Sequence, residues 1–294
     1  MNNNDYPNIF RVSDRKSKRA QNLFIRLNQS VLIILIISGA TSIVTPALNW
    51  LTITASILIT ISTILTILIL IVRPEKTWYE GRAIAESAKS LTWKFMMGTK
   101  PFNFQQNNEE AELKFINNLK KIVGQRKDFF ILVGSDFSSD EQITDVMSES
   151  RNLSLEDKIK MYSKDRIEEQ RKWYAKEAKK NMQFKNVSFI FLILFQVLAV
   201  VSLVLELYST INISLSPLLA CFSTSVIAWL QLKRFQELSE SYSITSTELN
   251  FIKSKLRHIQ DEQDLENFVD DSESAISREH TLWLARRDSV ELFD

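Results

Sequence analysis

The sequence predicts an all-α membrane protein with four transmembrane helices arranged as two hairpins, whose long helices extend into a cytoplasmic helical domain. Two stretches of the chain carry this prediction: residues 27–72 contain no charged side chain, and residues 186–232 contain only Glu206. One bilayer-spanning helix needs roughly 20 apolar residues, so each stretch is long enough for two crossings. The alternative, a large soluble bundle, would show a polar face at every turn of each helix, and neither stretch shows a charged one.

Each uncharged stretch divides into two helices joined by a short turn. The first turn is expected near Pro46 and Asn49, and the second lies before Pro217. The predicted segments are a basic N-terminal segment (1–30), a first transmembrane hairpin (31–73), a cytoplasmic helical region (74–186), a second transmembrane hairpin (187–232) and C-terminal cytoplasmic helices (233–294).

Lysine and arginine indicate the orientation of these hairpins. They are frequent in the polar segments and absent from both turns. Positive residues stay on the cytoplasmic side, so both termini and the middle region are expected in the cytoplasm, with the lipid bilayer as the first partner. No cleavable signal peptide is expected, because the first apolar stretch is much longer than a signal core of roughly 7 to 15 residues. The single cysteine, Cys221, lies in the fourth predicted crossing and allows no intrachain disulfide.

Few residues interrupt the helices in the second half of the chain. After Gly134, the only residue that breaks helices is Pro217. Ser154 suits an N-cap, and from there one helix of roughly 50 residues, about 75 Å long, is expected to continue into the third crossing. From Pro217 a second continuous helix is expected to reach about His258. Such rods either transmit motion to a pore or serve as passive stalks.

The cytoplasmic region is expected to contain shorter helices. Two of them cover about residues 75–97 and 109–123. Residues 129–133 are apolar and fit a strand or a helix equally well. Ser139, followed by acidic residues, is expected to begin another helix, and a last helix covers about residues 262–287.

One side of the second crossing carries hydroxyl groups, which fall within an arc of roughly 160° on a helical wheel. Hydroxyls can solvate ions or water in a pore, but they also bond to their own helix or to a neighbouring one. On the second hairpin, Gln196 either clasps another helix or narrows a pore. Glu206 either rings a pore mouth, which favours cations, or ends its helix among the headgroups. The candidate pore-lining residues are Thr52, Ser56, Thr60, Thr63, Thr66, Gln196 and Glu206.

Small residues mark candidate helix-packing faces, because they let another helix approach closely. On the first crossing they are Ser38 and Ser42, and on the fourth they are Ser216, Ala220, Thr224 and Ala228, one at every fourth position. Four helices in one chain are too few to surround an aqueous channel. Conduction would therefore require a homo-oligomer.

The composition gives little support to catalysis. The chain has two histidines, one cysteine inside a predicted crossing, no glycine loop for phosphates and no zinc-ligand spacing. We therefore expect no enzyme activity, no cofactor and no metal site, and the net charge of +1 gives no indication of nucleic-acid binding.

Four short runs of the chain carry a family resemblance: residues 77–87 (TWYEGRAIAES), 165–174 (DRIEEQRKWY), 229–235 (WLQLKRF) and 279–287 (EHTLWLARR). These runs resemble those of the bacterial SLATT family, two-crossing membrane effectors of conflict systems. The resemblance covers nearly the whole chain and implies two such units in tandem.

The resemblance also implies a function that the residue patterns alone do not give. It implies a pore-forming effector of antiviral defence and abortive infection, acting as a channel in the bacterial inner membrane. Such effectors are often encoded beside synthases of nucleotide second messengers or beside nucleotide-sensing proteins, which makes either one a candidate trigger. Arg82, Arg166 and Arg286 could receive a nucleotide phosphate, although pairing with neighbouring acidic residues competes with this role. The alternative is a non-conducting membrane scaffold that recruits cytoplasmic partners.

Overall fold

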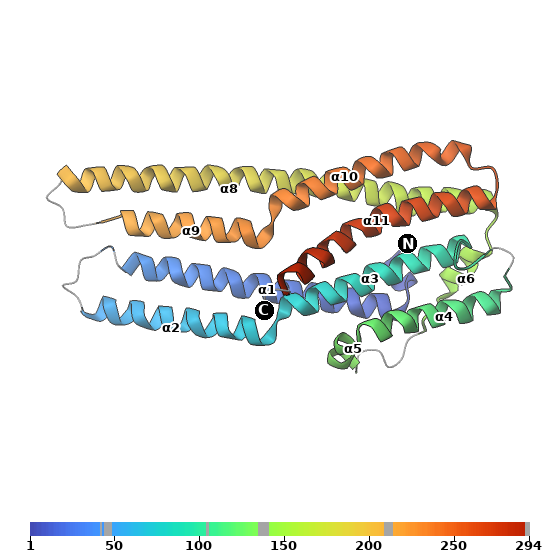
Figure 1. Cartoon of the computed structure of the whole chain (residues 1–294), viewed down its shortest axis with the longest axis horizontal. Helices are drawn as coiled ribbons and strands as arrows, with labels where there is room; N and C mark the ends of the chain where they lie inside the picture. The colour runs from blue at the N-terminus through green and yellow to red at the C-terminus, as the bar shows by residue number, and fades with distance from the viewer. Residues whose placement is uncertain (42, 44–48, 104–105, 135–140, 209–213, 292–294) are drawn as a thin grey trace. The chain divides into compact units, whose positions relative to one another are not determined.

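The computed structural model describes residues 1–41, 43, 49–103, 106–134, 141–208 and 214–291, with the side chains of residues 49, 128, 132, 133 and 278–291 left aside (Figure 1). Every regular element within these ranges is helical. The α-helices are α1 (Asn8–Thr41), α2 (Asn49–Val72), α3 (Pro74–Met97), α4 (Asn108–Gln125), α5 (Lys127–Val133), α6 (Asp145–Arg151), α7 (Leu155–Tyr162), α8 (Glu169–Tyr208), α9 (Ser216–Lys233), α10 (Phe235–Ser254) and α11 (Glu262–Glu291). A π-helix, Ser163–Glu168, joins α7 to α8, and short 3-10 helices cover Asn3–Asp5 and Lys255–His258.

Three helical runs among the described residues are long and apolar enough to cross a membrane: Asn8–Thr41, Trp50–Met97 and Leu155–Tyr208. At most 6% of the residues in the most apolar window of each run are buried within the chain. These apolar surfaces therefore need a cover that the chain itself does not supply, and lipid is such a cover. The fourth predicted crossing corresponds to α9, which has 18 residues and is not among the three.

The chain forms two compact units, each assembled from separate parts of the sequence. We call them the polar unit (Met1–Ala20, Glu75–Glu177 and Ser241–Asp294) and the apolar unit (Gln21–Pro74 and Ala178–Glu240). Both uncharged stretches of the sequence belong to the apolar unit.

Within the apolar unit, α1 packs against both α2 and α9. The Ser38 hydroxyl of α1 lies 3.5 Å from the Ala55 carbonyl oxygen of α2, to which it donates. On the side of α9, a Cβ placed on Gly39 would lie 3.4 Å from the Cβ and the Sγ of Cys221. The two helices are therefore in contact at this position, where an added methyl group would just fit.

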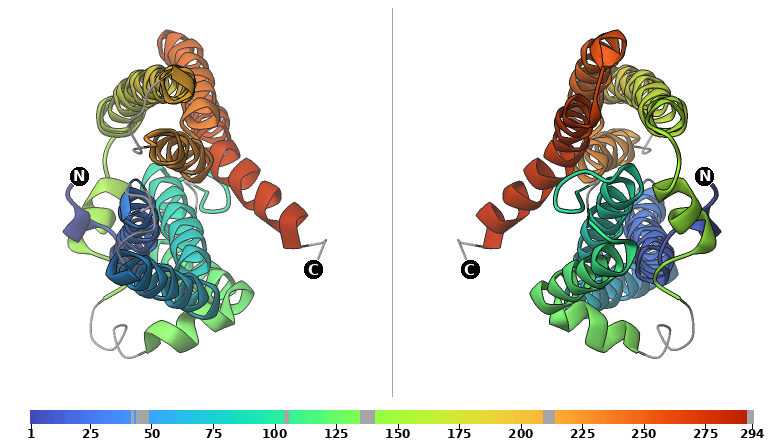
Figure 2. Two further views of the ribbon diagram at one scale, coloured as in Figure 1. Left: turned by 90° about the vertical axis from the view of Figure 1, so that its left-hand side faces the viewer. Right: turned by 90° about the vertical axis from the view of Figure 1, so that its right-hand side faces the viewer.

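Aromatic rings join α8 to α9 and to the start of α10. The rings of Phe195 and Phe222 stack with centroids 5.0 Å apart, and those of Phe184 and Phe235 stack at 5.5 Å. Figure 1 and the end-on views of Figure 2 agree that α8 lies beside α9 and that α1 lies beside α2. Within the apolar unit, α1 thus lies beside α2 and α9, and α8 lies beside α9.

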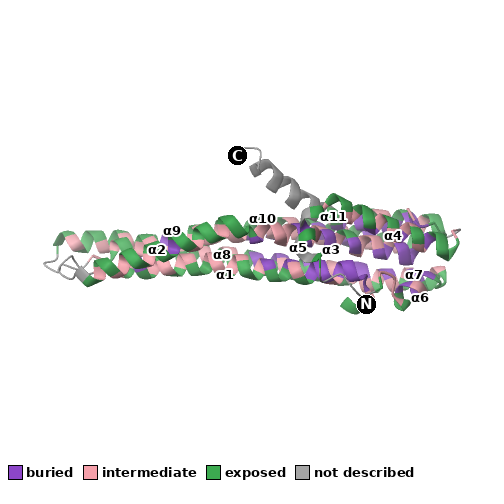
Figure 3. Cartoon of the chain, turned by 90° about the horizontal axis from the view of Figure 1, so that it is seen from below, coloured by how far each residue is buried: buried purple, intermediate pink, exposed green. Residues whose placement is uncertain are grey.

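The polar unit contains the hydrophobic core of the protein. Buried side chains concentrate in its helices, whereas the apolar unit is mostly intermediate or exposed (Figure 3). The largest of its fully buried apolar side chains include Trp93, Phe95, Phe102, Phe115, Phe129, Tyr162 and Tyr174. Several of these rings meet edge to face, as Trp93 and Tyr162 do at 5.5 Å between centroids.

The two predicted helices at about residues 75–97 and 109–123 are present as α3 and α4. Helix α3 ends at Gly98, whose φ of 70° is the left-handed conformation that glycine adopts readily. The ambiguous apolar run at residues 129–133 is helical, as part of α5. The Phe129 ring is buried in the core. The periodicity of this run fits a strand or a helix, and packing of Phe129 favours the helix.

The predicted helix start at Ser139 is wrong in position. Ser139 itself lies outside the described residues, but the helix begins only at Asp145, because Thr144 supplies the N-cap. The Thr144 hydroxyl accepts a hydrogen bond from the Met147 amide and donates one to the Asp5 carbonyl oxygen at 2.9 Å. This long-range bond was not visible in the local pattern.

The first predicted rod is present, with one local irregularity. Ser154 caps α7 as predicted, because its hydroxyl accepts from the Asp157 amide at 3.2 Å. Helix then continues from Leu155 to Tyr208, through the π-helix Ser163–Glu168. A π-helical turn inside an α-helix commonly marks a functional position.

The second predicted rod is wrong, because the chain breaks at Arg234. Helix α9 ends at Lys233 and α10 begins at Phe235, with Arg234 between them in the left-handed conformation at φ 47°. Arg73, between α2 and α3, has nearly the same φ, 46°. Each of these arginines donates its backbone N–H to the carbonyl oxygen four residues earlier, at 2.9 Å. Both breaks therefore have the same backbone conformation. Arg73 precedes Pro74, which is a helix-stop signal in the sequence, whereas Arg234 is followed by Phe235 and carries no such signal.

The close approach of α1 and α3 in the polar unit leads to a stability prediction. A Cβ at Gly81 would lie 3.0 Å from the Phe129 ring and 3.1 Å from the backbone oxygen of Ser13. We expect Gly81→Ala to lower the free energy of unfolding by about 1–3 kcal/mol, measured by thermal denaturation in detergent. Gly124→Ala is the control: nothing lies within 4 Å of its added Cβ, and it should be neutral or stabilising by up to about 1 kcal/mol. Equal effects of the two changes would contradict the close packing.

Candidate functional site

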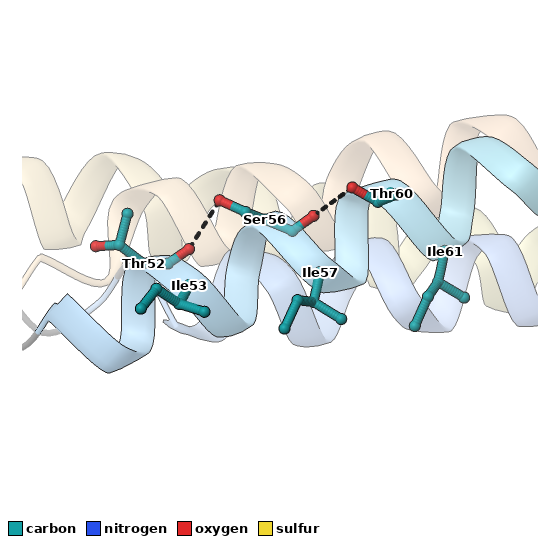
Figure 4. Close-up of a pocket in the computed structure, with 6 residues that line it drawn as sticks. All are labelled: Thr52, Ile53, Ser56, Ile57, Thr60 and Ile61. Atoms are coloured by element: carbon teal, nitrogen blue, oxygen red, sulfur yellow. Dashed lines mark hydrogen bonds between the residues drawn. The ribbon is translucent and has the colours of Figure 1, made fainter.

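The hydroxyl groups of α2 form an exposed strip on an otherwise apolar helix. The side chains of Thr52, Ser56, Thr60, Thr63 and Thr66 are all exposed within the chain. Figure 4 shows three of the hydroxyls along one side of the helix, beside a row of isoleucines. A shallow groove of about 360 Å³ lies along this part of the helix. It is lined by Thr52, Ile53, Ser56, Ile57, Thr60 and Ile61.

The hydroxyls bond to their own helix. Four of them donate to the carbonyl oxygen four residues earlier, at 2.9 Å for Ser56, 2.8 Å for Thr60, 2.9 Å for Thr63 and 3.0 Å for Thr66. Because the proton is used in this bond, each hydroxyl oxygen presents only lone pairs outward. The strip therefore offers hydrogen-bond acceptors, which suit cations and water and do not suit anions.

The other two pore-lining candidates lie on α8. The Gln196 side chain is exposed. The Glu206 carboxylate accepts hydrogen bonds from the Ser202 hydroxyl at 3.0 Å and the Ser214 hydroxyl at 2.9 Å. Glu206 thus ties the end of α8 to the segment just before α9, whether or not it also faces a pore.

The candidate packing residues occupy different environments. Ser38 is 5% exposed and contacts α2, whereas Ser42 lies outside the described residues. On α9, Ala220 and Thr224 are exposed, and Ser216 and Ala228 are half-buried. The close contact with α1 is made by Cys221, one residue and therefore about 100° around the helix from the predicted stripe. The spacing identified small residues but not the direction of the neighbouring helix.

Arg166, a candidate for binding a nucleotide phosphate, is buried in an ion pair. Its Nε and Nη2 donate to the two carboxylate oxygens of Glu273, at 2.8 and 2.7 Å, and both side chains are at most 2% exposed. The Tyr162 hydroxyl donates to the same carboxylate at 2.9 Å. The neighbouring partner expected from sequence was Asp165; Glu273 was missed because it lies on α11, 107 residues away.

Arg82 is the accessible member of the arginine candidates. Its guanidinium pairs with Glu86 at 2.8 Å and lies 4.0 Å from Asp14, with 37% of the side chain exposed. Glu86 was one of the partners expected from sequence. The side chain of Arg286 lies outside the described residues.

Further buried polar groups surround Arg166. Burial alone would lower the pKa of the Arg166 guanidinium, but the charge of Glu273 and its hydrogen bonds outweigh burial and raise that pKa. Burial raises the pKa of Tyr6 to about 12 and raises the pKa of Tyr162 as well. Burial, followed by repulsion from Arg166, lowers the pKa of Lys89. This cluster joins α11 to the rest of the polar unit, and no local motif pointed to it.

Comparison with known protein families gives two matches in tandem. Residues 7–159 match the SMODS and SLOG-associating 2TM effector domain 3 (SLATT_3), and residues 162–283 match the SMODS and SLOG-associating 2TM effector domain 1 (SLATT_1). Neither the comparison with curated proteins nor that with solved structures gave a match.

The two family domains do not coincide with the two compact units. The first domain contains α1 and α2, the second contains α8 and α9, and both pairs lie in the apolar unit. Each domain also supplies helices to the polar unit. The first match covers more than half of the chain, and the second continues it to residue 283. This protein belongs to the SLATT family of membrane effectors, with two effector domains in tandem.

Proposed function

We propose that this protein is an oligomeric pore-forming effector that depolarises or permeabilises the bacterial inner membrane in response to an infection signal. In this proposal, α1, α2, α8 and α9 cross the membrane as two hairpins, both termini are cytoplasmic, and the polar unit receives the signal. The family match, the apolar helical runs and the contacts among α1, α2, α8 and α9 support this topology.

The exposed hydroxyl strip of α2 is the observation that carries the pore proposal. The strip faces away from the helices that α2 packs against within its own chain, where the buried Ser62 lies instead at 5% exposure. In lipid, the outward lone pairs of Ser56, Thr60 and Thr63 gain no partner, whereas around a shared axis they contact water and ions. Several copies, each contributing one α2, therefore complete an acceptor-lined pore.

The signal is proposed to be a nucleotide second messenger or a cytoplasmic sensor protein. Three arginines were considered for phosphate binding, and the side chains of two, Arg82 and Arg166, are described. Of these two, only Arg82 is accessible. Arg166 would first have to leave Glu273, so it suits a structural role. The surface around Arg82 is thus the part of the polar unit to probe for the trigger.

The proposal is tested by ion flux. The purified full-length chain, reconstituted into liposomes of Escherichia coli polar lipid loaded with potassium, should release potassium, and cross-linking should show assemblies larger than a monomer. Flux should rise steeply with the protein-to-lipid ratio, because the pore needs several copies. A chain that stays monomeric at every ratio, with potassium retained, would rule out the pore.

A second candidate function is a non-conducting membrane scaffold that recruits cytoplasmic partners. One observation favours it: the hydroxyls of the α2 strip already have backbone partners, so they do not require water. Under this alternative, substitutions in the strip leave the cellular activity intact.

A further inference from the structure

A second pocket lies within the apolar unit, beside the junction of α9 with α10. It has a volume of about 350 Å³, within the roughly 300–1,000 Å³ typical of ligand pockets. All its lining residues belong to the apolar unit and come from α8 and the junction of α9 with α10: Lys185, Phe189, Leu230, Gln231, Arg234, Phe235, Gln236 and Glu237.

The lining of this pocket changes from polar to apolar along the helices. Lys185 is the last charged residue before the uncharged stretch of α8, and Arg234 follows the apolar part of α9. Phe189 and Leu230 lie on the apolar side of these two charges. The pocket therefore presents positive groups at one end and a hydrocarbon-like surface at the other.

The charges around the pocket are unbalanced. Lys185 has no ion pair or hydrogen bond with the described residues, and Arg234 pairs only loosely with Glu237, at 3.6 Å. Next to them, the Lys233 ammonium lies 5.7 Å from the centre of the Trp229 ring and 6.0 Å from that of Phe235. Two cations and one carboxylate thus line the pocket, with the Lys233 ammonium nearby in the chain, and an anion in the pocket would be attracted.

The backbone of Arg234 has a strained conformation. Arg234 has φ 47°, a conformation that costs a non-glycine residue energy, and its N–H is bonded to the Leu230 carbonyl oxygen at 2.9 Å. An arginine where glycine would be less strained suggests a use for the side chain. Guanidinium groups are especially suited to phosphate, because they donate two parallel hydrogen bonds.

We propose that this pocket binds an anionic phospholipid, with the phosphate between Lys185 and Arg234 and an acyl chain along Phe189 and Leu230. Positively charged pockets between transmembrane helices at the membrane surface are suited to acidic headgroups. The proposal rests on the membrane topology of the second hairpin proposed above, but it does not require a pore. The lipid would hold the junction of α9 and α10 at the level of the headgroups.

The test is retention of phosphatidylglycerol by the full-length chain in detergent, measured by native mass spectrometry after titration with dioctanoyl phosphatidylglycerol. We expect saturable binding to the wild type and a roughly tenfold or larger loss of affinity in Lys185→Gln combined with Arg234→Gly. Glycine suits the left-handed position, so this variant should fold. Glu237→Gln should bind severalfold more tightly, a gain that a folding defect cannot imitate.

Two controls separate this pocket from general attraction between charges. Lys179→Gln removes an exposed cation of α8 outside the pocket and should leave affinity unchanged. Dioctanoyl phosphatidylcholine and inorganic phosphate should bind at least tenfold more weakly than phosphatidylglycerol. Equal binding of phosphatidylcholine, equal binding of inorganic phosphate, or unchanged affinity in the double variant would each overturn the proposal. Because the readout is bound lipid, a protein that conducts no ions can still pass this test.

Discussion

Replacing Arg166 with methionine is expected to lower the free energy of unfolding of the polar unit by about 3–5 kcal/mol. The change leaves the Glu273 carboxylate, 2% exposed, without its charged partner and with only the Tyr162 hydroxyl donating from the same cluster. Glu273→Gln should cost a similar amount, because it leaves the buried guanidinium without a countercharge. Chemical denaturation followed by far-ultraviolet circular dichroism in detergent measures both effects.

The matched control is Arg82→Met. Its ion pair with Glu86 is 37% exposed on the arginine side, so its loss should cost less than about 1 kcal/mol. The double variant Arg166→Met with Glu273→Leu should be more stable than either single variant, since no charge is then left buried alone. If Arg166→Met is no more destabilising than Arg82→Met, the buried pair does not hold α11 in place.

Converting Thr60 and Thr63 together to valine is expected to reduce potassium conductance by about tenfold or more. Valine keeps the shape of threonine but removes the outward lone pairs, and a barrier higher by about 1.4 kcal/mol lowers a rate tenfold. In an oligomer every copy loses two acceptors. Single-channel recording in planar bilayers measures this effect.

Thr54→Val is the control for this substitution. Thr54 lies on the same helix and also bonds to a carbonyl oxygen four residues earlier, that of Trp50, at 2.8 Å. Its position is about 120° around the helix from Thr60 and about 180° from Thr63, on the half-buried side, so conductance should be unchanged. Equal conductance in the wild type, the Thr60 and Thr63 double variant and Thr54→Val would favour the scaffold and contradict the pore.

The sequence predicted those features of the fold that depend on local composition. Uncharged stretches of sufficient length located the apolar helices, and Ser154 located the start of α7, because both signals act over one or a few helical turns. The tandem family domains were also recognisable, from short runs beside each hairpin.

Features that depend on distant contacts could not be predicted in this way. The break at Arg234 carries no glycine or proline signal. The hydroxyl of the N-cap residue Thr144 also bonds to the backbone of Asp5, which lies 139 residues away near the N-terminus. The pairing of Arg166 with Glu273 joins residues 107 positions apart. In each case packing in three dimensions selected one arrangement among several that the local sequence allows.

The sequence placed the hydroxyl strip of α2 correctly on one helix but could not give its surroundings. Helical spacing groups Thr52, Ser56 and Thr60, yet only the structure shows that they are exposed within one chain. On α9 the same reasoning identified Ala220 and Thr224, whereas the neighbouring helix approaches at Cys221. Periodicity defines the faces of a helix but does not state which face meets a partner.

The central claim, a pore lined by α2, is tested most directly by current across a planar bilayer that separates two potassium chloride concentrations. We expect stepwise currents whose reversal potential lies towards the equilibrium potential of potassium, because the lining oxygens of Ser56, Thr60 and Thr63 are acceptors. A reversal potential at the chloride value, or a bilayer that remains non-conducting with the oligomer present, would contradict it.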